Sequence, residues 1–120
     1  MILDPKNEQD LEEIKEAIRE DFSDDTTGIK RSAAAAIAYI KGAIGQDKPS
    51  FYETDNEYTD LLNLSILMLT DHYYHARSAT IETSNATGGL REYDLGFNSL
   101  ILQLKASYKV FKEGESTEKI

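Results

Sequence analysis

The chain has 120 residues, no cysteine and a formal net charge of −9. This length fits a single domain, and the absence of cysteine excludes both a disulfide framework and thiolate chemistry. Binding to a phosphate backbone needs clustered lysine and arginine, so the acidic balance argues against direct nucleic-acid binding. The first ten residues lack the basic start and apolar run of a signal peptide, so we expect a protein that is used inside a cell.

The first predicted helix covers residues 8–21, after an irregular segment over residues 1–7. Apolar residues recur on one face at spacings of three and four, and the opposite face is rich in glutamate. The apolar residues are Leu11, Ile14 and Ile18, and the spacing allows Phe22 to join them. The pattern predicts an amphipathic helix with an acidic outer face.

A second helix is predicted over residues 26–44, with an alanine-rich middle that lets another helix approach closely. Gly45 is its natural stop, because glycine readily takes the conformation that ends a helix. In the connector 46–54, Pro49 forbids continuation of the helix. We expect Phe51 and Tyr52 to pack back on the core.

The longest apolar stretch predicts a central helix over residues 55–78. Asp55 is placed to cap its first turn. Apolar residues cover so much of its circumference that we expect other helices to wrap it. The run is too short, and too polar at both ends, to span a membrane.

The segment 79–95 is polar and contains Gly88-Gly89, so we expect a long loop in which residues 80–83 and 90–93 can form a short hairpin. A connection of this length commonly carries function. The last helix is predicted over residues 98–112, followed by a charged, flexible tail over 113–120. We therefore expect one all-α domain, residues 1–112, of about four helices. Its second and third helices form a long antiparallel pair.

Asp71, His72 and His75 are the one group that resembles a metal or catalytic site. Zinc sites need three or four protein ligands, and the chain has no other histidine and no cysteine to supply them. No serine lies in a nucleophile elbow, and Gly88-Gly89 lacks the flanking pattern of a phosphate loop. We therefore expect no metal, no cofactor and no enzymatic activity.

Three lysines, Lys105, Lys109 and Lys112, follow one side of the last predicted helix. They can pair with the acidic first helix of the same subunit, or they can contact an acidic neighbour. The sequence favours the internal pairing and leaves the second possibility open.

The order of these elements resembles the small head–tail connector (adaptor) proteins of long-tailed bacteriophages and prophages, over about residues 8–106. The first helix carries the pattern Leu11, Ile14, Lys15, Ile18 and Arg19. The second carries Ala36, Tyr39, Ile40 and Gly45, and the end of the central helix carries His72, Tyr74 and Arg77. A variable loop and a final helix close the domain in both. The resemblance implies that Tyr39, Ile40, Gly45, His72, Tyr74 and Arg77 belong to the motif core.

The resemblance implies a structural virion protein. Such a subunit forms a ring under the portal protein, extends the DNA channel and docks head-completion or tail proteins. It is monomeric or weakly oligomeric in the host cytoplasm before assembly, with no sequence-specific nucleic-acid binding and no membrane contact. The alternative is a small acidic helical regulatory module of bacterial origin that binds a single protein partner. We expect contacts with partners or neighbouring subunits at Thr80, Glu82, Thr87, Gly88, Gly89, Leu90, Arg91, Glu92, Tyr93, Lys105 and Lys109.

Overall fold

Every regular element in the described part of the chain is a helix, which confirms the predicted all-α class. The computed structural model describes the backbone of residues 1–76 and 83–118, and the side chains of residues 1–76 and 96–114. Its elements are α1 (Glu8–Ala17), α2 (Thr26–Ile44), α3 (Ser50–Glu53), α4 (Thr59–Ala76) and α5 (Thr83–Glu118).

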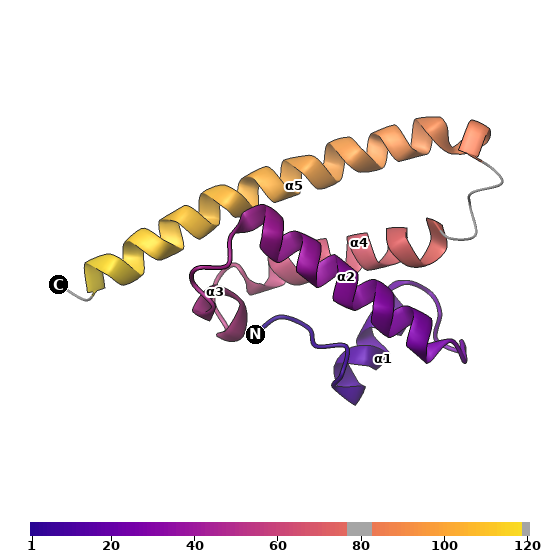
Figure 1. Cartoon of the computed structure of the whole chain (residues 1–120), viewed down its shortest axis with the longest axis horizontal. Coiled ribbons are helices and arrows are strands. Elements are labelled where there is room, and N and C mark those ends of the chain that lie inside the picture. Colours follow the sequence, from indigo (N-terminus) through magenta and orange to yellow (C-terminus); the bar gives the residue numbers. More distant parts are fainter. Residues whose placement is uncertain (77–82, 119–120) are drawn as a thin grey trace.

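Helices α2 and α4 form the centre of the bundle and run antiparallel, as predicted (Figure 1). Helix α5 packs against both of them on one side, while α1 packs against both on the opposite side (Figure 1). At 1.5 Å per residue, the 36 residues of α5 reach roughly 54 Å. The longest dimension of the molecule is 55 Å, so α5 alone spans it.

Two apolar clusters hold the helices together. The larger cluster joins α2, α3, α4 and α5, and the smaller one joins the amino-terminal segment and α1 to α2 and α4. Phe51 and Tyr52 are buried in the larger cluster, which confirms that this connector packs on the core. The fully buried side chains of both clusters include Ile14, Ile18, Ile29, Ile40, Phe51, Leu62, Ile66 and Leu104.

Helix α2 has the predicted bounds at both ends. The side chain of Asp25 accepts a hydrogen bond from the amide of Gly28 at 3.1 Å, which satisfies one of the free donors of the first turn. At the other end, Gly45 has φ of 144°, a backbone angle that only glycine adopts readily. Local chemistry therefore determines both limits of this helix.

Helix α1 ends at Ala17, not near Asp21 as predicted, because a Schellman cap closes it. The amide of Glu20 donates to the carbonyl of Lys15 at 2.8 Å, and the amide of Arg19 donates to the carbonyl of Glu16 at 3.1 Å. The early end removes Phe22 from the helical face. Its side chain is 100% exposed, so the expectation that it joins the core is wrong.

The cap leads to a first prediction about stability. Arg19 occupies the left-handed position of the Schellman motif with φ of 62°, which is unfavourable for any residue with a Cβ atom. Arg19→Gly removes this strain, although glycine also gains freedom in the unfolded chain. We expect the free energy of unfolding to rise by about 0.5–1 kcal/mol in urea titrations. Arg31→Gly, within α2, is the matched control and is expected to destabilise the protein.

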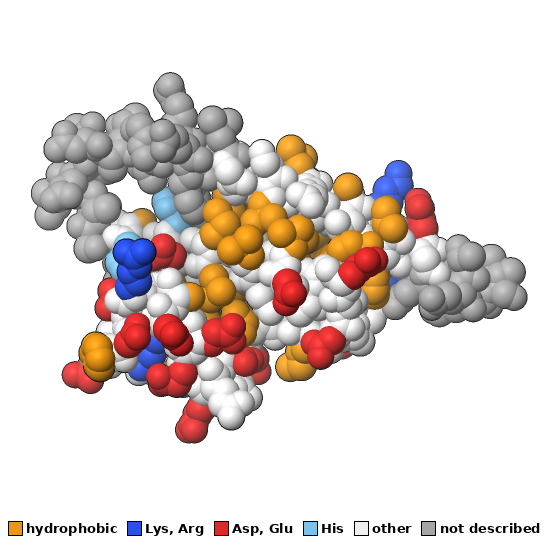
Figure 2. All heavy atoms as spheres, turned by 180° about the vertical axis from the view of Figure 1, so that it is seen from behind, with side chains coloured by type: hydrophobic (Ala, Val, Ile, Leu, Met, Phe, Trp, Pro, Cys, Tyr) orange, Lys and Arg blue, Asp and Glu red, His pale blue; other side chains and the backbone are white. Residues whose placement is uncertain are grey.

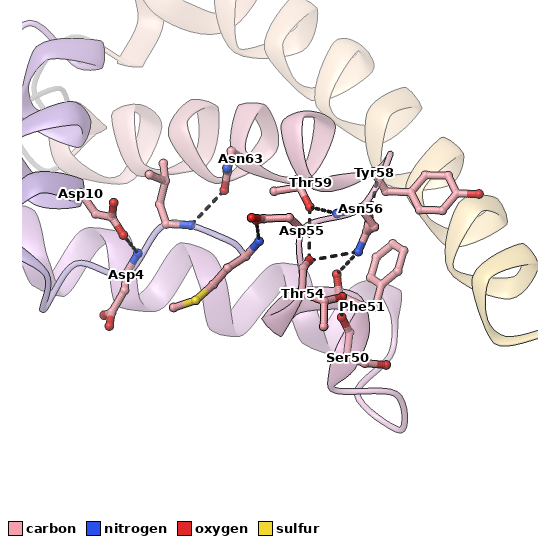
Figure 3. A network of polar contacts seen from close by, with 12 residues as sticks. Asp4, Asp10, Ser50, Phe51, Thr54, Asp55, Asn56, Tyr58, Thr59 and Asn63 are labelled. Atoms are coloured by element: carbon pink, nitrogen blue, oxygen red, sulfur yellow. Dashed lines mark hydrogen bonds and ion pairs between the residues drawn. The ribbon is translucent and has the colours of Figure 1, made fainter. Parts of the chain in front are cut away.

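Helix α4 begins at Thr59, so the prediction that Asp55 caps it is wrong (Figure 3). Asn56 takes over the turn: its side-chain oxygen accepts from the amide of Tyr58 at 2.8 Å, and its own amide donates to the hydroxyl of Thr59 at 3.0 Å. Asp55 instead pairs with the amino group of Met1. An asparagine turn that competes with helical hydrogen bonding thus delays the helix by one turn.

The amino-terminal segment is tied to α3 and α4 by hydrogen bonds from its backbone amides. The amide of Ile2 donates to the carbonyl of Tyr52 at 2.9 Å. The amide of Leu3 donates to the side-chain oxygen of Asn63 at 2.9 Å (Figure 3). Leu3 is also buried against α1. This irregular segment is therefore part of the core.

Helix α5 begins at Thr83, about fifteen residues earlier than predicted, so neither a hairpin nor a loop occupies residues 83–95. The physical reason is that no proline interrupts this stretch, and each glycine costs a helix only about 1 kcal/mol. Once the packed part of α5 is formed, extending it is cheap, because the nucleation cost has already been met. Residues 79–82 of the expected loop lie outside the described residues. The helix continues to Glu118, and a separate flexible tail over 113–120 stays a prediction.

Candidate functional site

The two histidines of α4 lie in different surroundings. His75 lies between two carboxylates, with Nδ1 2.6 Å from an oxygen of Asp71 and Nε2 3.0 Å from an oxygen of Glu20. His72 lies beside Tyr73, their rings 6.2 Å apart. Among the described residues, no group of three or more His, Asp or Glu side chains could hold a metal ion. The His75 cluster ties α4 to the turn that follows α1.

This cluster predicts a pH-dependent stability. Partial burial lowers the pKa of His75, but hydrogen bonds to Glu20 and Asp71 outweigh it, so the net pKa is raised above 6.5. The stabilisation is complete below the unfolded-state pKa and is lost as the pH rises through the higher folded-state pKa. Because the side chain is 46% exposed, we expect a loss below about 1 kcal/mol between pH 6 and pH 8.

The measurement is urea unfolding of the wild-type protein and of His75→Gln across this pH range. The variant should be less stable than the wild type at the acidic end and should lack the step. An equal step in both proteins would assign it to other groups, and Asp71→Asn should reduce the step without abolishing it.

The end of α2 and the surface of α5 meet at a polar junction centred on Asp47. Lys112 donates to one oxygen of Asp47 at 2.5 Å, and the hydroxyl of Tyr108 donates to the other. The hydrogen bond from Lys112, reinforced by Tyr108, lowers the pKa of Asp47 to about 2. Tyr108 also accepts from the amide of Lys48 at 2.8 Å. The junction therefore fixes the α2–α3 connector to α5.

This geometry decides part of the question about the lysine face. Lys112 pairs with the connector and not with the acidic α1. Lys105 and Lys109 are exposed and form no ion pair within the described residues. They line a shallow groove with Ile44 and Gly45. Among the described residues, therefore, neither of these lysines pairs with α1, and both remain open to a partner.

Helix α4 is not wrapped on all sides, which corrects the prediction made from its composition. Leu64 is 50% exposed, and Leu61 and Met68 beside it are half-buried. Figure 2 shows apolar side chains gathered in the middle of the face opposite to the view of Figure 1. The wide apolar stripe thus serves both the core and the surface.

The predicted contact and motif residues fall in several environments. Thr80, Glu82 and Arg77 lie outside the described residues, and residues 87–93 lie on the amino-terminal part of α5 with their side chains not described. Ile40 and Tyr74 are buried, and Gly45 ends α2. His72 is half-buried. Tyr39, expected in the motif core, is 51% exposed.

The sequence did not predict that Phe22, in the turn after α1, lies on the surface. Phe22 lines an open depression there with Glu16, Arg19, Glu20 and Asp21. A signal was present, since Phe22 lies just before the Ser23-Asp24-Asp25 run that caps the next helix. A residue between two helix ends has no helical face to share.

The chain is thus a small all-α domain whose described surface offers charged and apolar patches. The family model described as phage gp6-like head-tail connector protein matches residues 8–105. The chain belongs to this family, and it is a phage structural connector protein. Neither the search of curated proteins nor the search of solved structures returned a significant match. No helix among the described residues is long and apolar enough to cross a membrane.

Proposed function

We propose that this protein is a subunit of a ring that sits under the portal protein at the head–tail junction of the virion. The ring extends the DNA channel and docks head-completion or tail proteins, and its subunits are not enzymes. The observation that carries this proposal is the family match over residues 8–105. The net charge of −9 supports it, because an acidic channel wall lets DNA pass without adhering.

In the proposal, the subunit is a monomer or a weak oligomer in the host cytoplasm before assembly. Subunits that bind weakly in solution assemble on a multivalent platform, because each bound neighbour raises the effective concentration of the next. The amino-terminal part of α5, with residues 87–93, and the segment 79–82 before it are proposed to contribute contacts to the portal or to later components. Lys105 and Lys109 are proposed as contacts between subunits.

The test is to express the protein together with the portal protein encoded in the same phage genome. We expect the two to co-purify, and electron microscopy to show an added ring of density below the portal. Arg91→Glu with Tyr93→Ala should weaken this binding at unchanged helicity, and Lys6→Glu is the control. A one-to-one complex with a single bacterial protein, and no binding to the portal, would contradict the proposal.

A further inference from the structure

The molecule carries two surfaces of opposite charge on opposite sides. Residues 12–24 contain six acidic and two basic residues, whereas residues 96–112 contain three lysines and no acidic residue. Figure 2 shows the acidic side chains crowded around the α1 end of the molecule. Helices α1 and α5 lie on opposite sides of the α2–α4 pair (Figure 1). These two surfaces therefore cannot meet within one subunit.

Each surface also carries exposed apolar side chains. In the acidic turn, Phe22 is 100% exposed, and the depression that it lines also contains Glu16, Glu20 and Asp21 together with Arg19. A phenylalanine held fully in water is unfavourable, and burying it in a contact is a strong source of affinity. The carboxylates beside Phe22 disfavour a purely apolar partner, because such a partner would leave their negative charges uncompensated.

The outer face of α5 provides the complementary pattern. Leu102 is 65% exposed and Val110 is 58% exposed, and Ala106 lies between them at the same spacing of four. Residues four apart share one face of a helix. Lys105 and Lys109 are exposed beside this stripe. The α5 surface is thus an apolar strip with a basic edge.

We infer that Phe22 and the acidic turn of one subunit dock onto the Leu102–Val110 strip and its lysines in a second copy of this chain. The occupant is a second copy because the two surfaces are opposite in charge and both carry exposed apolar side chains. The two patches differ, so the contact is head-to-tail, and repetition of it builds a closed ring or a filament. This inference rests on the proposed function, since it names the surfaces by which the ring closes.

Because the chain has no cysteine, crosslinking can test the contact directly. Asp24→Cys and Ala106→Cys place thiols next to the two surfaces without removing Phe22 or a lysine. With a short bismaleimide at low salt, the double variant should give a ladder of dimers, trimers and larger species. A mixture of the two single variants should stop at dimers. Crosslinking of either single variant with itself would show a two-fold contact and overturn the inference.

Charge reversal provides an independent arm. Lys105→Glu with Lys109→Glu should weaken self-association at least tenfold in sedimentation, and so should Glu16→Lys with Asp21→Lys. Combining all four changes in one chain should restore it. Lys6→Glu with Arg31→Glu lies outside both surfaces, matches the charge change of the lysine reversal and should have a much smaller effect. A failure of the four-fold variant to recover would overturn the pairing.

The outcomes separate this inference from the proposed function. Rings on the portal without crosslinks in the double variant would overturn the choice of surfaces and leave the connector role intact. Crosslinked ladders without any binding to the portal would support the contact and contradict the connector role. The absence of self-association both in free solution and on the portal would overturn the inference.

Discussion

Phe51→Ala is expected to cause the largest loss of stability, about 3–5 kcal/mol in the free energy of unfolding. Phe51 is fully buried in α3, where its ring packs against its neighbour in α3, the residue just before α4 and two aromatic residues of α5. Deleting the ring removes its apolar contacts and leaves a cavity that the surrounding backbone cannot fill. Its aromatic neighbours, with ring centroids 5.1–5.6 Å away, are Tyr52, Tyr58, Tyr108 and Phe111.

The measurement is urea unfolding, monitored by circular dichroism. Phe51→Leu keeps most of the volume and should cost much less than Phe51→Ala. Tyr39→Ala is the aromatic control on the surface and should change the stability only slightly, because half of that side chain is already exposed. Equal losses for Phe51→Ala and Tyr39→Ala would show that the aromatic cluster does not hold α5 to the bundle.

The consequence for assembly is indirect but measurable. Phe51 lies where the connector meets α5, and α5 carries the Leu102–Val110 strip and its lysines, which we propose as a subunit contact. A destabilised cluster should therefore weaken self-association in proportion to the unfolded population, in contrast to a charge reversal at Lys105, which leaves the bundle folded. Comparing both variants under conditions where each is fully folded separates the two effects.

The helices with strong local signals were predictable from the sequence. Helix α2 is limited by Asp25 and Gly45, whose capping chemistry acts within a few residues, and both limits agree with the structure. The burial of Phe51 followed from aromatic residues in a short connector. These are cases in which local preference and tertiary packing favour the same outcome.

The errors arose where tertiary context or an unusual residue overrides a preference. Arg19 takes a conformation that normally needs glycine, so no glycine marks the early end of α1, and the helical spacing placed Phe22 on the apolar face despite the capping run that follows it. Gly88-Gly89 is typical of a turn, yet these residues extend α5 on the amino-terminal side of its packed part. Helix propensity is a weak preference of about 1 kcal/mol per glycine, which a long, packed helix can overcome.

The candidate contact surfaces were only partly visible in the sequence, because they combine distant segments. The lysine spacing on α5 was apparent in the sequence. The lysine that pairs within the subunit is Lys112, and its partner is Asp47 of the connector and not the acidic helix. Nothing in the one-dimensional pattern placed the acidic turn and the lysines on opposite sides of the molecule. That relation depends on how α1 and α5 pack on the central pair.

Gly45→Ala is expected to cost about 2–4 kcal/mol, from backbone strain and overpacking together. Gly45 has φ of 144°, and a Cβ atom there would lie 2.6 Å from Cε1 of Tyr108. The ring cannot easily retreat, because its hydroxyl is held by Asp47 and by the amide of Lys48. The carbonyl of Gly45 also accepts a hydrogen bond from Tyr52 at 2.5 Å, which fixes the backbone.

Gly42→Ala, three residues earlier in α2, is the matched control. A Cβ atom at Gly42 would meet nothing within 4 Å, so alanine should stabilise the helix there by about 0.5–1 kcal/mol. The same chemical change is thus expected to have opposite signs at two neighbouring glycines. Urea unfolding of both variants measures this difference. If Gly45→Ala is as stable as the wild type, the close approach of α5 to the end of α2 does not constrain the fold. The position of the Leu102–Val110 strip would then depend on Phe51 and its aromatic neighbours.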